Sequence, residues 1–575
     1  MPVLRLALAQ INPRLGDFSY NATLIADYVA RAHEAGADLV VFPEMSLTGY
    51  PIEDLARRPD FLADARQHRD ELATDLAHRG LGDIVVVLGL PTPAHSTEPS
   101  TNPHAISHNS AVVVQHGRVL GQYHKHHLPN YSVFDEFRNF VPGTSVAIIH
   151  VKGVDVGLVI CEDIWHDHGP LEALAPVEPG LVLVLNGSPY ERDKDDVRIP
   201  LVQRRAQELN APVAYVNLVG GQDDLVFDGD SFIVTASGTL ASRATRFAED
   251  LLIHDVKASD AKPYLRSRVG ALSLIETDAV LSLPKAPLSV SVRNDDQDAL
   301  RDVWEALVLG LRDYVDKNRF PSVVLGLSGG IDSAVCASLS VDAIGPERVF
   351  GVSMPSKYSS DHSQDDAHDL AGRLGVHLRV EPIEDMVGPV ESQLNLENVA
   401  AENLQARMRG VILMSLSNAE GHLALTTGNK TEIAVGYSTI YGDSVGGFAP
   451  LKDVPKTLVW QLARWRNAEA LRLKQTPPIP ENSISKPPSA ELRPGQVDQD
   501  TLPPYEILDA IVDAYVTHNR SLAEILALGF DRATVERVIG LIRRSEWKRR
   551  QGAIGPKISE MAFGRDRRLP ITSAL

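Results

Sequence analysis

One stretch of the chain decides much of its fold: Val323-Val324-Leu325-Gly326-Leu327-Ser328-Gly329-Gly330-Ile331-Asp332-Ser333. An apolar run precedes two glycines and a helix start, so the stretch predicts a strand, a tight turn and a helix. The glycines let the backbone approach a phosphate, and the N–H groups at the helix N-terminus supply partial positive charge. The pattern therefore predicts a site for a nucleotide phosphate. The alternative is an ordinary glycine-rich turn.

No lysine follows the glycines, so the stretch is not the Walker-type loop whose lysine reaches the terminal phosphates. It resembles instead the pyrophosphate loop of ATP-pyrophosphatase enzymes, which split ATP between the α and β phosphates and leave AMP on a substrate oxygen. The resemblance implies that the ATP contacts of the loop come from Gly326, Leu327, Ser328, Gly329, Gly330, Ile331, Asp332 and Ser333.

Bulk composition limits the possible functions. A chain of 575 residues is too long for one core, so two or more domains are expected. The formal net charge of -19 argues against a general binder of nucleic acid or of anionic membranes. The two cysteines, Cys161 and Cys336, provide neither a disulfide framework nor a zinc-thiolate site, which favours the reducing cytoplasm. The N-terminal run is short and contains Arg5, unlike a signal peptide.

The first half of the chain alternates short β-rich runs with helical periodicity, which predicts layered α/β structure. A helix is expected over Thr23–Ala35, and the turn Gln115–Arg118 is expected to join two strands as a hairpin. The expected strands are Leu4–Gln10, Leu39–Phe42, Ile84–Leu90, Ala111–Val114, Val156–Ile160, Leu181–Leu185 and Val213–Val216.

A proline-containing polar segment, Leu283–Asp296, predicts an interdomain connection, and an amphipathic helix is expected over Ala299–Asp316. Beyond the phosphate loop, strands and helices alternate again, which predicts a doubly wound parallel sheet. Those elements are the strands Val349–Met354 and Leu423–Thr426 and the helices Gln364–Leu374 and Asn403–Leu416. We expect domains at residues 1–275 and 297–575, joined by a linker at 276–296.

Thr476–Pro504 differs from the rest of the chain because it holds eight prolines and little periodic hydrophobicity. Its composition favours a disordered linker. Its position inside a catalytic domain allows a second interpretation, a lid that orders over substrate.

Three residues near the ends of predicted strands are chemically capable: Glu44, Lys125 and Cys161. A carboxylate, an ammonium and a thiol are the groups needed to attack an amide through a thioester. Glu44 can take the thiol proton, Lys125 can stabilise the thiolate and the developing oxyanion, and Cys161 is the nucleophile. Each residue alone is more often structural or solvated, and the histidines at 124, 126 and 127 are more often surface groups than metal ligands.

In this order the three residues resemble the triad of the nitrilase, or carbon-nitrogen hydrolase, superfamily, and the resemblance covers residues 1 to about 275. It implies an α-β-β-α sandwich, with Glu136 as the second, positioning carboxylate. The loop Asn186–Tyr190 is similar to the substrate loop of the glutamine-hydrolysing members. By that resemblance Tyr131, Ser188 and Lys194 hold glutamine.

The second half contains a further strand, turn and helix start at Leu423–Glu432. Asp332 is placed to hold Mg²⁺, Glu432 to complete that metal site and Thr427 to contact ATP. Basic residues are dispersed and include Lys456, Lys486, Lys548 and the Arg407/Arg409 pair. Charge runs such as Arg543-Arg544 and Lys548-Arg549-Arg550 are expected to be mostly solvated helix faces.

Together these segments resemble the NAD synthetase family in its glutamine-dependent, two-domain form. The segments that carry the resemblance are Ser328–Ser333, Asn403–Arg407, Thr427–Glu432, Tyr441–Asp443, Lys486–Leu492 and Glu546–Arg549. The family implies that Asn403, Arg407, Glu432 and Lys548 meet deamido-NAD, and that Lys456 and Ser489 join the loop around ATP. Short ammonia-using relatives carry a lysine before their Tyr-Gly-Asp, where this chain has Ile440, so that phosphate contact must be absent or come from elsewhere.

The expected reaction is ATP-dependent amidation of deamido-NAD with ammonia taken from glutamine, with Mg²⁺ and without a redox cofactor, because NAD is the product. A homo-oligomer with small-molecule substrates is expected, and neither nucleic acid nor a membrane is an expected partner. Two other hypotheses are a pyrophosphate-loop enzyme that thiolates or amidates RNA and a regulatory binding protein with an inactive amidase domain. The acidic charge opposes the first, and the intact Glu44, Lys125 and Cys161 oppose the second.

Overall fold

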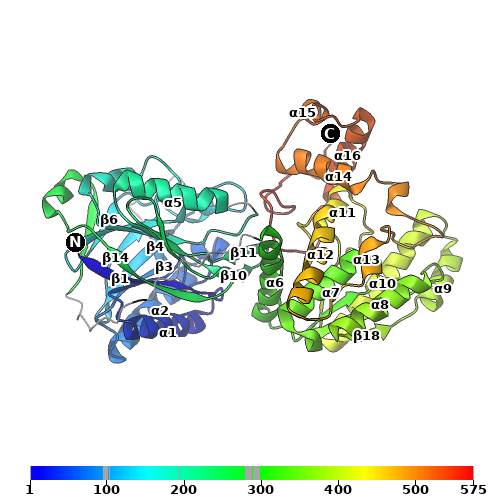
Figure 1. Ribbon diagram of the computed structural model, residues 1–575, viewed down its shortest axis with the longest axis horizontal. Coiled ribbons are helices and arrows are strands. Elements are labelled where there is room, and N and C mark those ends of the chain that lie inside the picture. Colours follow the sequence, from blue (N-terminus) through cyan, green and yellow to red (C-terminus); the bar gives the residue numbers. More distant parts are fainter. Residues whose placement is uncertain are drawn as a thin grey trace. The chain divides into compact units, whose positions relative to one another are not determined.

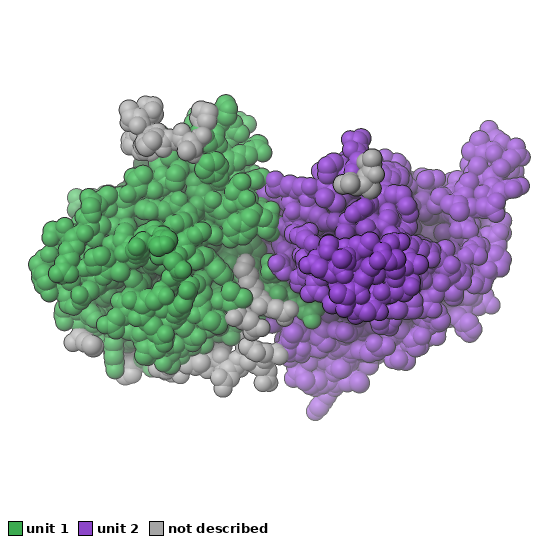
Figure 2. Space-filling view, turned by 90° about the horizontal axis from the view of Figure 1, so that it is seen from above, with its two compact units in different colours: residues 1–220, 227–297 green, residues 221–226, 298–575 purple. Residues whose placement is uncertain are grey.

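The computed structural model (Figure 1) describes residues 2–94, 102, 104–192, 195–278, 288 and 298–573. Contacts divide the chain into two compact units, which Figure 2 colours separately. The first unit comprises residues 1–220 and 227–297, and the second comprises residues 221–226 and 298–575. Most of the predicted linker at 276–296 lies outside the described residues. Within the described residues, no helix is long and apolar enough to cross a membrane.

The first unit is built on two sheets. The six-stranded sheet has the order β14 (Asp250–Lys257), β1 (Val3–Gln10), β2 (Leu39–Val41), β3 (Val85–Pro93), β4 (Ser107–Gln115), β5 (Arg118–His124). The seven-stranded sheet has the order β13 (Leu240–Arg243), β12 (Phe232–Val234), β9 (Val213–Asn217), β8 (Leu181–Asn186), β7 (Val154–Ile160), β6 (Val146–Val151), β15 (Leu272–Glu276).

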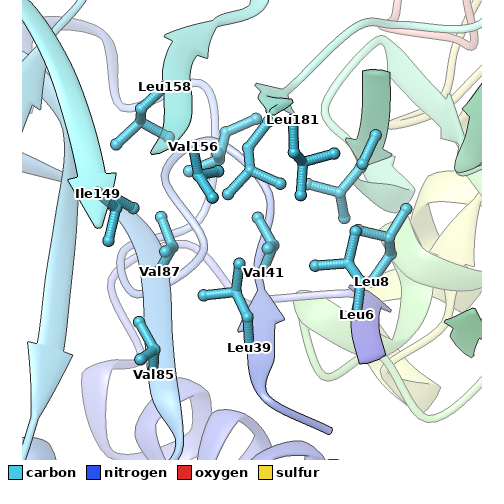
Figure 3. Packing of buried hydrophobic residues seen from close by; sticks show 14 of the residues in the cluster. Leu6, Leu8, Leu39, Val41, Val85, Val87, Ile149, Val156, Leu158 and Leu181 are labelled. Carbon is cyan, nitrogen blue, oxygen red and sulfur yellow. The ribbon is translucent and has the colours of Figure 1, made fainter. Parts of the chain in front are cut away.

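The strands of the first unit are buried on both faces, because side chains alternate along a strand and each sheet has a partner layer on either side. In β1, Leu4, Leu6 and Leu8 belong to the core between the two sheets, whereas Ala7 and Ala9 face the helical layer. Figure 3 shows the core between the sheets, where Leu6 and Val41 of one sheet face Val156 and Leu181 of the other.

Helices cover the outer face of each sheet (Figure 1). The helices α1 (Phe18–Glu34) and α2 (Pro59–His78) pack on the six-stranded sheet, and α4 (Pro170–Leu174) and α5 (Asp195–Leu209) pack on the seven-stranded sheet. The α-β-β-α sandwich implied by the sequence resemblance is confirmed.

The second unit contains a four-stranded parallel sheet with the order β18 (His377–Val380), β17 (Val349–Ser353), β16 (Val323–Gly326), β19 (Leu423–Ala424). The chain runs outward from β16 to β18 and then returns to the other side of β16. The sheet therefore has a switch point between β16 and β19, where doubly wound sheets bind ligands. The predicted parallel sheet is confirmed, although β19 ends two residues earlier than expected.

Helices flank this sheet and form a second cluster near the C-terminus (Figure 1). They are α6 (Ala299–Lys317), α7 (Ile331–Ile344), α8 (Asp361–Leu374), α9 (Glu384–Leu394), α10 (Val399–Glu420), α11 (Lys430–Val435), α12 (Lys456–Arg472), α13 (Glu481–Ser485), α14 (Tyr505–Val512), α15 (Leu522–Leu526), α16 (Arg532–Arg544) and α17 (Glu546–Arg549). Helix α6 begins where Asp298 accepts hydrogen bonds from the backbone N–H groups of Leu300 and Arg301, an N-cap that fixes the predicted helix start.

The second unit also contains residues 221–226, the tip of a hairpin formed by β10 (Val219–Gln222) and β11 (Leu225–Asp228). The Gly221 N–H donates to Asp313 of α6 at 2.7 Å, and Lys317 donates to the Gly221 carbonyl at 2.8 Å. The periodicity of the sequence did not indicate that residues 221–226 belong to the second unit, because this segment lies within the first half of the chain.

Candidate active sites

The predicted carboxylates and lysine of the first unit meet in a buried cluster. The Lys125 Nζ atom lies 2.9 Å from Glu44 Oε1 and 2.7 Å from Glu136 Oε2. Burial lowers the pKa of Lys125, but the negative charges of Glu136 and Glu44 raise it by more than burial lowers it. The net shift of this pKa is therefore upward. Burial raises the pKa of Glu136 to about 7 against the opposing effect of Lys125. Lys125 is therefore held as a cation between two carboxyl groups.

Neighbouring polar groups orient the two carboxyl groups. Asn109 donates to Glu44 Oε1 at 2.6 Å, and the Gly187 N–H donates to Glu44 Oε2 at 2.8 Å. Tyr50 donates to Glu136 at 2.9 Å. Asn109 lies within β4, whereas Tyr50 and Gly187 lie in separate segments outside strands, so sequence spacing did not reveal these partners.

Cys161 begins the 3-10 turn that follows β7, and its φ of 45° lies in the left-handed region. This region is uncommon for a non-glycine residue, and residues held in it occur often at functional sites. Burial raises the thiol pKa well above its ordinary value, and the negative charge of Glu44 raises it further, while Lys125 opposes both. The thiol is thus protonated at rest and needs a base to become a nucleophile.

We expect Glu44→Gln to lower the pKa of the Cys161 thiol, because the substitution removes a negative charge that disfavours the thiolate. The rate of Cys161 alkylation by iodoacetamide, followed by peptide mass spectrometry against pH, would then have its midpoint at lower pH than in the wild type. The buried Cys336 serves as the internal control. A midpoint that moves to higher pH would contradict this electrostatic account.

Asp163 is a site residue that the sequence did not single out. Its buried carboxylate accepts hydrogen bonds from Tyr123 and from the backbone N–H groups of Ile160, His126 and His127, at 2.7 to 3.1 Å. Ile160 directly precedes Cys161, and Tyr123, His126 and His127 flank Lys125 in the sequence. Asp163 therefore ties Cys161 and Lys125 into one fixed arrangement.

The predicted glutamine-binding residues differ in their surroundings. Tyr131 is largely exposed and donates to Glu162 at 2.9 Å, next to Cys161. Ser188 is buried, and its N–H donates to Asn217 at 2.9 Å. Lys194 lies outside the described residues.

The second unit contains a cavity of about 350 Å³ at the switch point of its sheet. That volume is within the ordinary range for small-molecule sites. All of the predicted ATP-binding residues except Gly329 line it, and so do Glu432 and Lys548. Asn403 and Arg407 are not among its lining residues. Asn403 accepts a hydrogen bond from Thr439, and Arg407 donates to the Ile440 carbonyl at 3.3 Å.

The phosphate loop connects β16 to α7 by a turn that requires glycine. Gly329 has φ 73°, and a Cβ atom there would lie 2.3 Å from the Ser363 carbonyl oxygen. Within the loop, Ser328 accepts from the Gly330 N–H at 3.2 Å, and Ser333 donates to the Gly330 carbonyl at 2.9 Å. The glycine thus allows the backbone to pass closely under α8.

Asp332 and Glu432 converge on the cation of Lys456. The Lys456 Nζ atom contacts Asp332 Oδ2 and lies 3.5 Å from Glu432 Oε1. Asn429 donates to Asp332 Oδ1 at 3.0 Å. In the described residues no group of three or more His, Cys, Asp or Glu side chains is placed to hold a metal. Two carboxylates nevertheless fit Mg²⁺, which is commonly held by one or two carboxylates together with substrate phosphates.

The proline-rich segment Thr476–Pro504 is not the disordered linker that its composition favoured. Asn467 of α12 bonds both the N–H and the carbonyl of Ile479, and Glu491 accepts from Ser363 at 2.6 Å. Residues 486–492 line the cavity. The prediction from composition was wrong because side chains from other elements form hydrogen bonds with polar groups of this segment. In an isolated segment these groups would bond to water.

Fold and site together define a two-unit protein, with an amidohydrolase-type unit and a nucleotide-binding unit of the pyrophosphate-loop type. A family model described as carbon-nitrogen hydrolase matches residues 5–266, and one described as NAD synthase matches residues 303–552.

Full-length relatives specify the family. Glutamine-dependent NAD(+) synthetase of Acinetobacter baylyi is 43% identical over 100% of this chain and 99% of its own, and that of Xanthomonas campestris is 45% identical over 99% and 97%. A solved structure of glutamine-dependent NAD+ synthetase from Acinetobacter baumannii, in complex with ADP, is 40% identical, with a TM-score of 0.71 over 99% of this chain and 98% of that chain. This chain belongs to the glutamine-dependent NAD(+) synthetase family.

Proposed function

We propose that this protein is a magnesium-dependent ligase that converts deamido-NAD to NAD, using ATP and the amide nitrogen of glutamine. The products are AMP, pyrophosphate and glutamate. The observation that carries the proposal is the presence in one chain of the Glu44–Lys125–Glu136 cluster beside Cys161 and of the cavity lined by the phosphate loop. Family membership supports the same reaction.

In the first unit, Cys161 attacks the side-chain amide carbon of glutamine while Glu44 takes the thiol proton. Lys125 stabilises the charge that develops on the carbonyl oxygen, and Glu136 keeps Lys125 in place. Collapse of the tetrahedral intermediate returns the proton to the leaving nitrogen and releases ammonia. Water, deprotonated by Glu44, then hydrolyses the thioester to glutamate. Tyr131, Ser188 and Lys194 are proposed to hold the glutamine.

In the second unit, the nicotinate carboxylate of deamido-NAD attacks the α phosphorus of ATP and pyrophosphate leaves. Ammonia then displaces AMP from the mixed anhydride and forms the amide. The loop N–H groups, Thr427, Lys456 and Ser489 are proposed to bind ATP. Asn403, Arg407, Glu432 and Lys548 are proposed to contact deamido-NAD. Asp332 and Glu432 would hold Mg²⁺, which supplies charge neutralisation for the phosphates.

Neutral ammonia is the nucleophile, and water at pH 7 protonates most of it, so we propose a protected passage for it. We further propose a homo-oligomer, following the pairing of synthetase domains in the family, that works in the cytoplasm without nucleic acid or membrane partners.

The test is product analysis of the purified protein with glutamine, Mg-ATP and deamido-NAD. We expect NAD, AMP, pyrophosphate and glutamate in equal amounts. ADP in place of AMP, or glutamate without NAD, would contradict the proposal.

Asp163→Asn is expected to slow glutamine hydrolysis by about 100-fold, a typical cost of misplacing reacting groups by about 1 Å. Both oxygens of Asp163 accept hydrogen bonds. In either orientation of the asparagine side chain, its NH₂ group would replace one of these oxygens and would face N–H or O–H donors with which it cannot form a hydrogen bond. A glutaminase assay measures the loss, and ammonium-driven NAD synthesis provides the control. Unchanged glutamine hydrolysis would show that Asp163 does not position the nucleophile.

Gly329→Ala is expected to weaken ATP binding strongly, because the new methyl group meets the Ser363 carbonyl and alanine disfavours positive φ. Calorimetric titration with ATP measures the effect. Gly372→Ala on α8 is the matched control, since a Cβ atom there meets no atom within 4 Å. Equal ATP affinity in the two variants would refute the proposed role of the turn.

A further inference from the structure

The cavity of the second unit is lined by cations and also by carboxylates, which are those of Asp332, Glu432, Asp443, Glu491 and Asp498. Its lining cations are Arg409, Lys452, Lys456, Lys486, Lys548 and Arg549. Lys456, Lys486 and Arg549 pair with carboxylates of Asp332, Asp366 and Glu546. The other three donate to backbone carbonyls. No ion pair within 4.0 Å involves these three among the residues that the structure describes.

Arg409 is placed on the cavity side of α10. The lining residues of this helix are Ala406, Arg409, Gly410 and Leu413. Their spacing of i, i+3, i+4 and i+7 is that of a single helix face. Arg407 is exposed and lies off this face, because a step of two residues turns a helix by about 200°. Of the two neighbouring arginines, the cavity therefore receives Arg409.

Arg409 retains most of its hydrogen-bonding capacity. Its Nε donates to the Met354 carbonyl at 3.0 Å, directly after the carboxyl end of β17. Within the described part of the chain this is its one side-chain hydrogen bond, which leaves the terminal N–H donors of the guanidinium available. Burial lowers the pKa of Arg409, opposed by the charges of Glu491 and Asp443, yet an arginine in a protein stays charged.

The planar fork of a charged guanidinium can donate parallel hydrogen bonds to two oxygens of a phosphate, and this one lies at the edge of a parallel sheet where nucleotides bind. We propose that Arg409 binds a phosphate group of a nucleotide substrate, from ATP or from the dinucleotide. This inference rests on the proposed function.

The test compares Arg409→Met and Arg409→Lys with the wild type, with ammonium as nitrogen source so that the first unit does not limit the rate. KM is measured separately for ATP and for deamido-NAD. We expect Arg409→Met to raise one KM by about 10- to 100-fold, the usual loss for hydrogen bonds to a charged group. The KM of Arg409→Lys should lie between those of the wild type and Arg409→Met, because lysine keeps the positive charge but lacks the planar arrangement of N–H donors. The substrate whose KM rises is the one that Arg409 binds.

Arg532→Met on α16, an exposed arginine paired with Glu536, is the matched control for loss of a guanidinium. Circular dichroism verifies that each variant is folded, and calorimetric titration with ATP gives a readout independent of turnover. Both KM values within about threefold of wild type in a folded Arg409→Met would overturn the inference. Absence of NAD synthesis in the wild type would instead overturn the proposed function.

Discussion

Cys161→Ala is expected to abolish NAD formation from glutamine while leaving NAD formation from added ammonium near the wild-type rate. In the proposed mechanism the thiol is the nucleophile that attacks the amide, and neither Glu44 nor Lys125 can replace it. Removing a covalent nucleophile costs about 10⁶-fold in a serine hydrolase whose triad was dissected in this way. The measurement is the NAD yield with each nitrogen source in turn.

The use of two nitrogen sources makes this experiment selective. The phosphate loop and its cavity belong to the second unit, so ammonium should still displace AMP from the adenylated intermediate. Loss of both activities in a folded Cys161→Ala protein would contradict the assignment of separate chemistry to the two units.

Asp332→Asn is expected to produce the complementary result, a loss of NAD synthesis with either nitrogen source. Asp332 lies at the start of α7, contacts Lys456 and is a proposed ligand of Mg²⁺. Loss of one such charge from a phosphoryl-transfer site costs about 100- to 1,000-fold. Initial rates of AMP release with glutamine and with ammonium measure the effect.

Asp365→Asn is the matched control for this substitution, because Asp365 is exposed on α8 and its change removes the same charge. Alkylation of Cys161 should proceed normally in Asp332→Asn. Normal AMP release by Asp332→Asn would rule out the proposed metal and phosphate site.

Much of the fold was predictable because both units rely on local signals. Alternating apolar residues in β1 and the turn at Gly329 and Gly330 indicate strand and turn without reference to the rest of the chain. The hairpin tip at residues 221–226 was missed because its contacts with Asp313 and Lys317 join positions about 90 residues apart.

The candidate site residues that the sequence suggested are those whose own functional groups can perform chemistry. Glu44, Lys125 and Cys161 have functional groups that suggest a reaction, and each follows a strand. Asp163 and Asn109 act through hydrogen bonds to other residues, so only the folded structure identifies them. Residue type also does not distinguish Arg409 from Arg407 in α10. Only the geometry of the helix shows that Arg409 lies on the face that lines the cavity.

The central claim is that the amide nitrogen of glutamine becomes the amide nitrogen of NAD within one protein. It is tested most directly by supplying glutamine labelled with ¹⁵N at the side-chain amide, together with Mg-ATP and deamido-NAD, in ammonium-free buffer. Mass spectrometry of the nicotinamide fragment should show the label in the NAD product, with AMP formed in equal amount. Unlabelled NAD, or labelled ammonia released without NAD, would contradict the account.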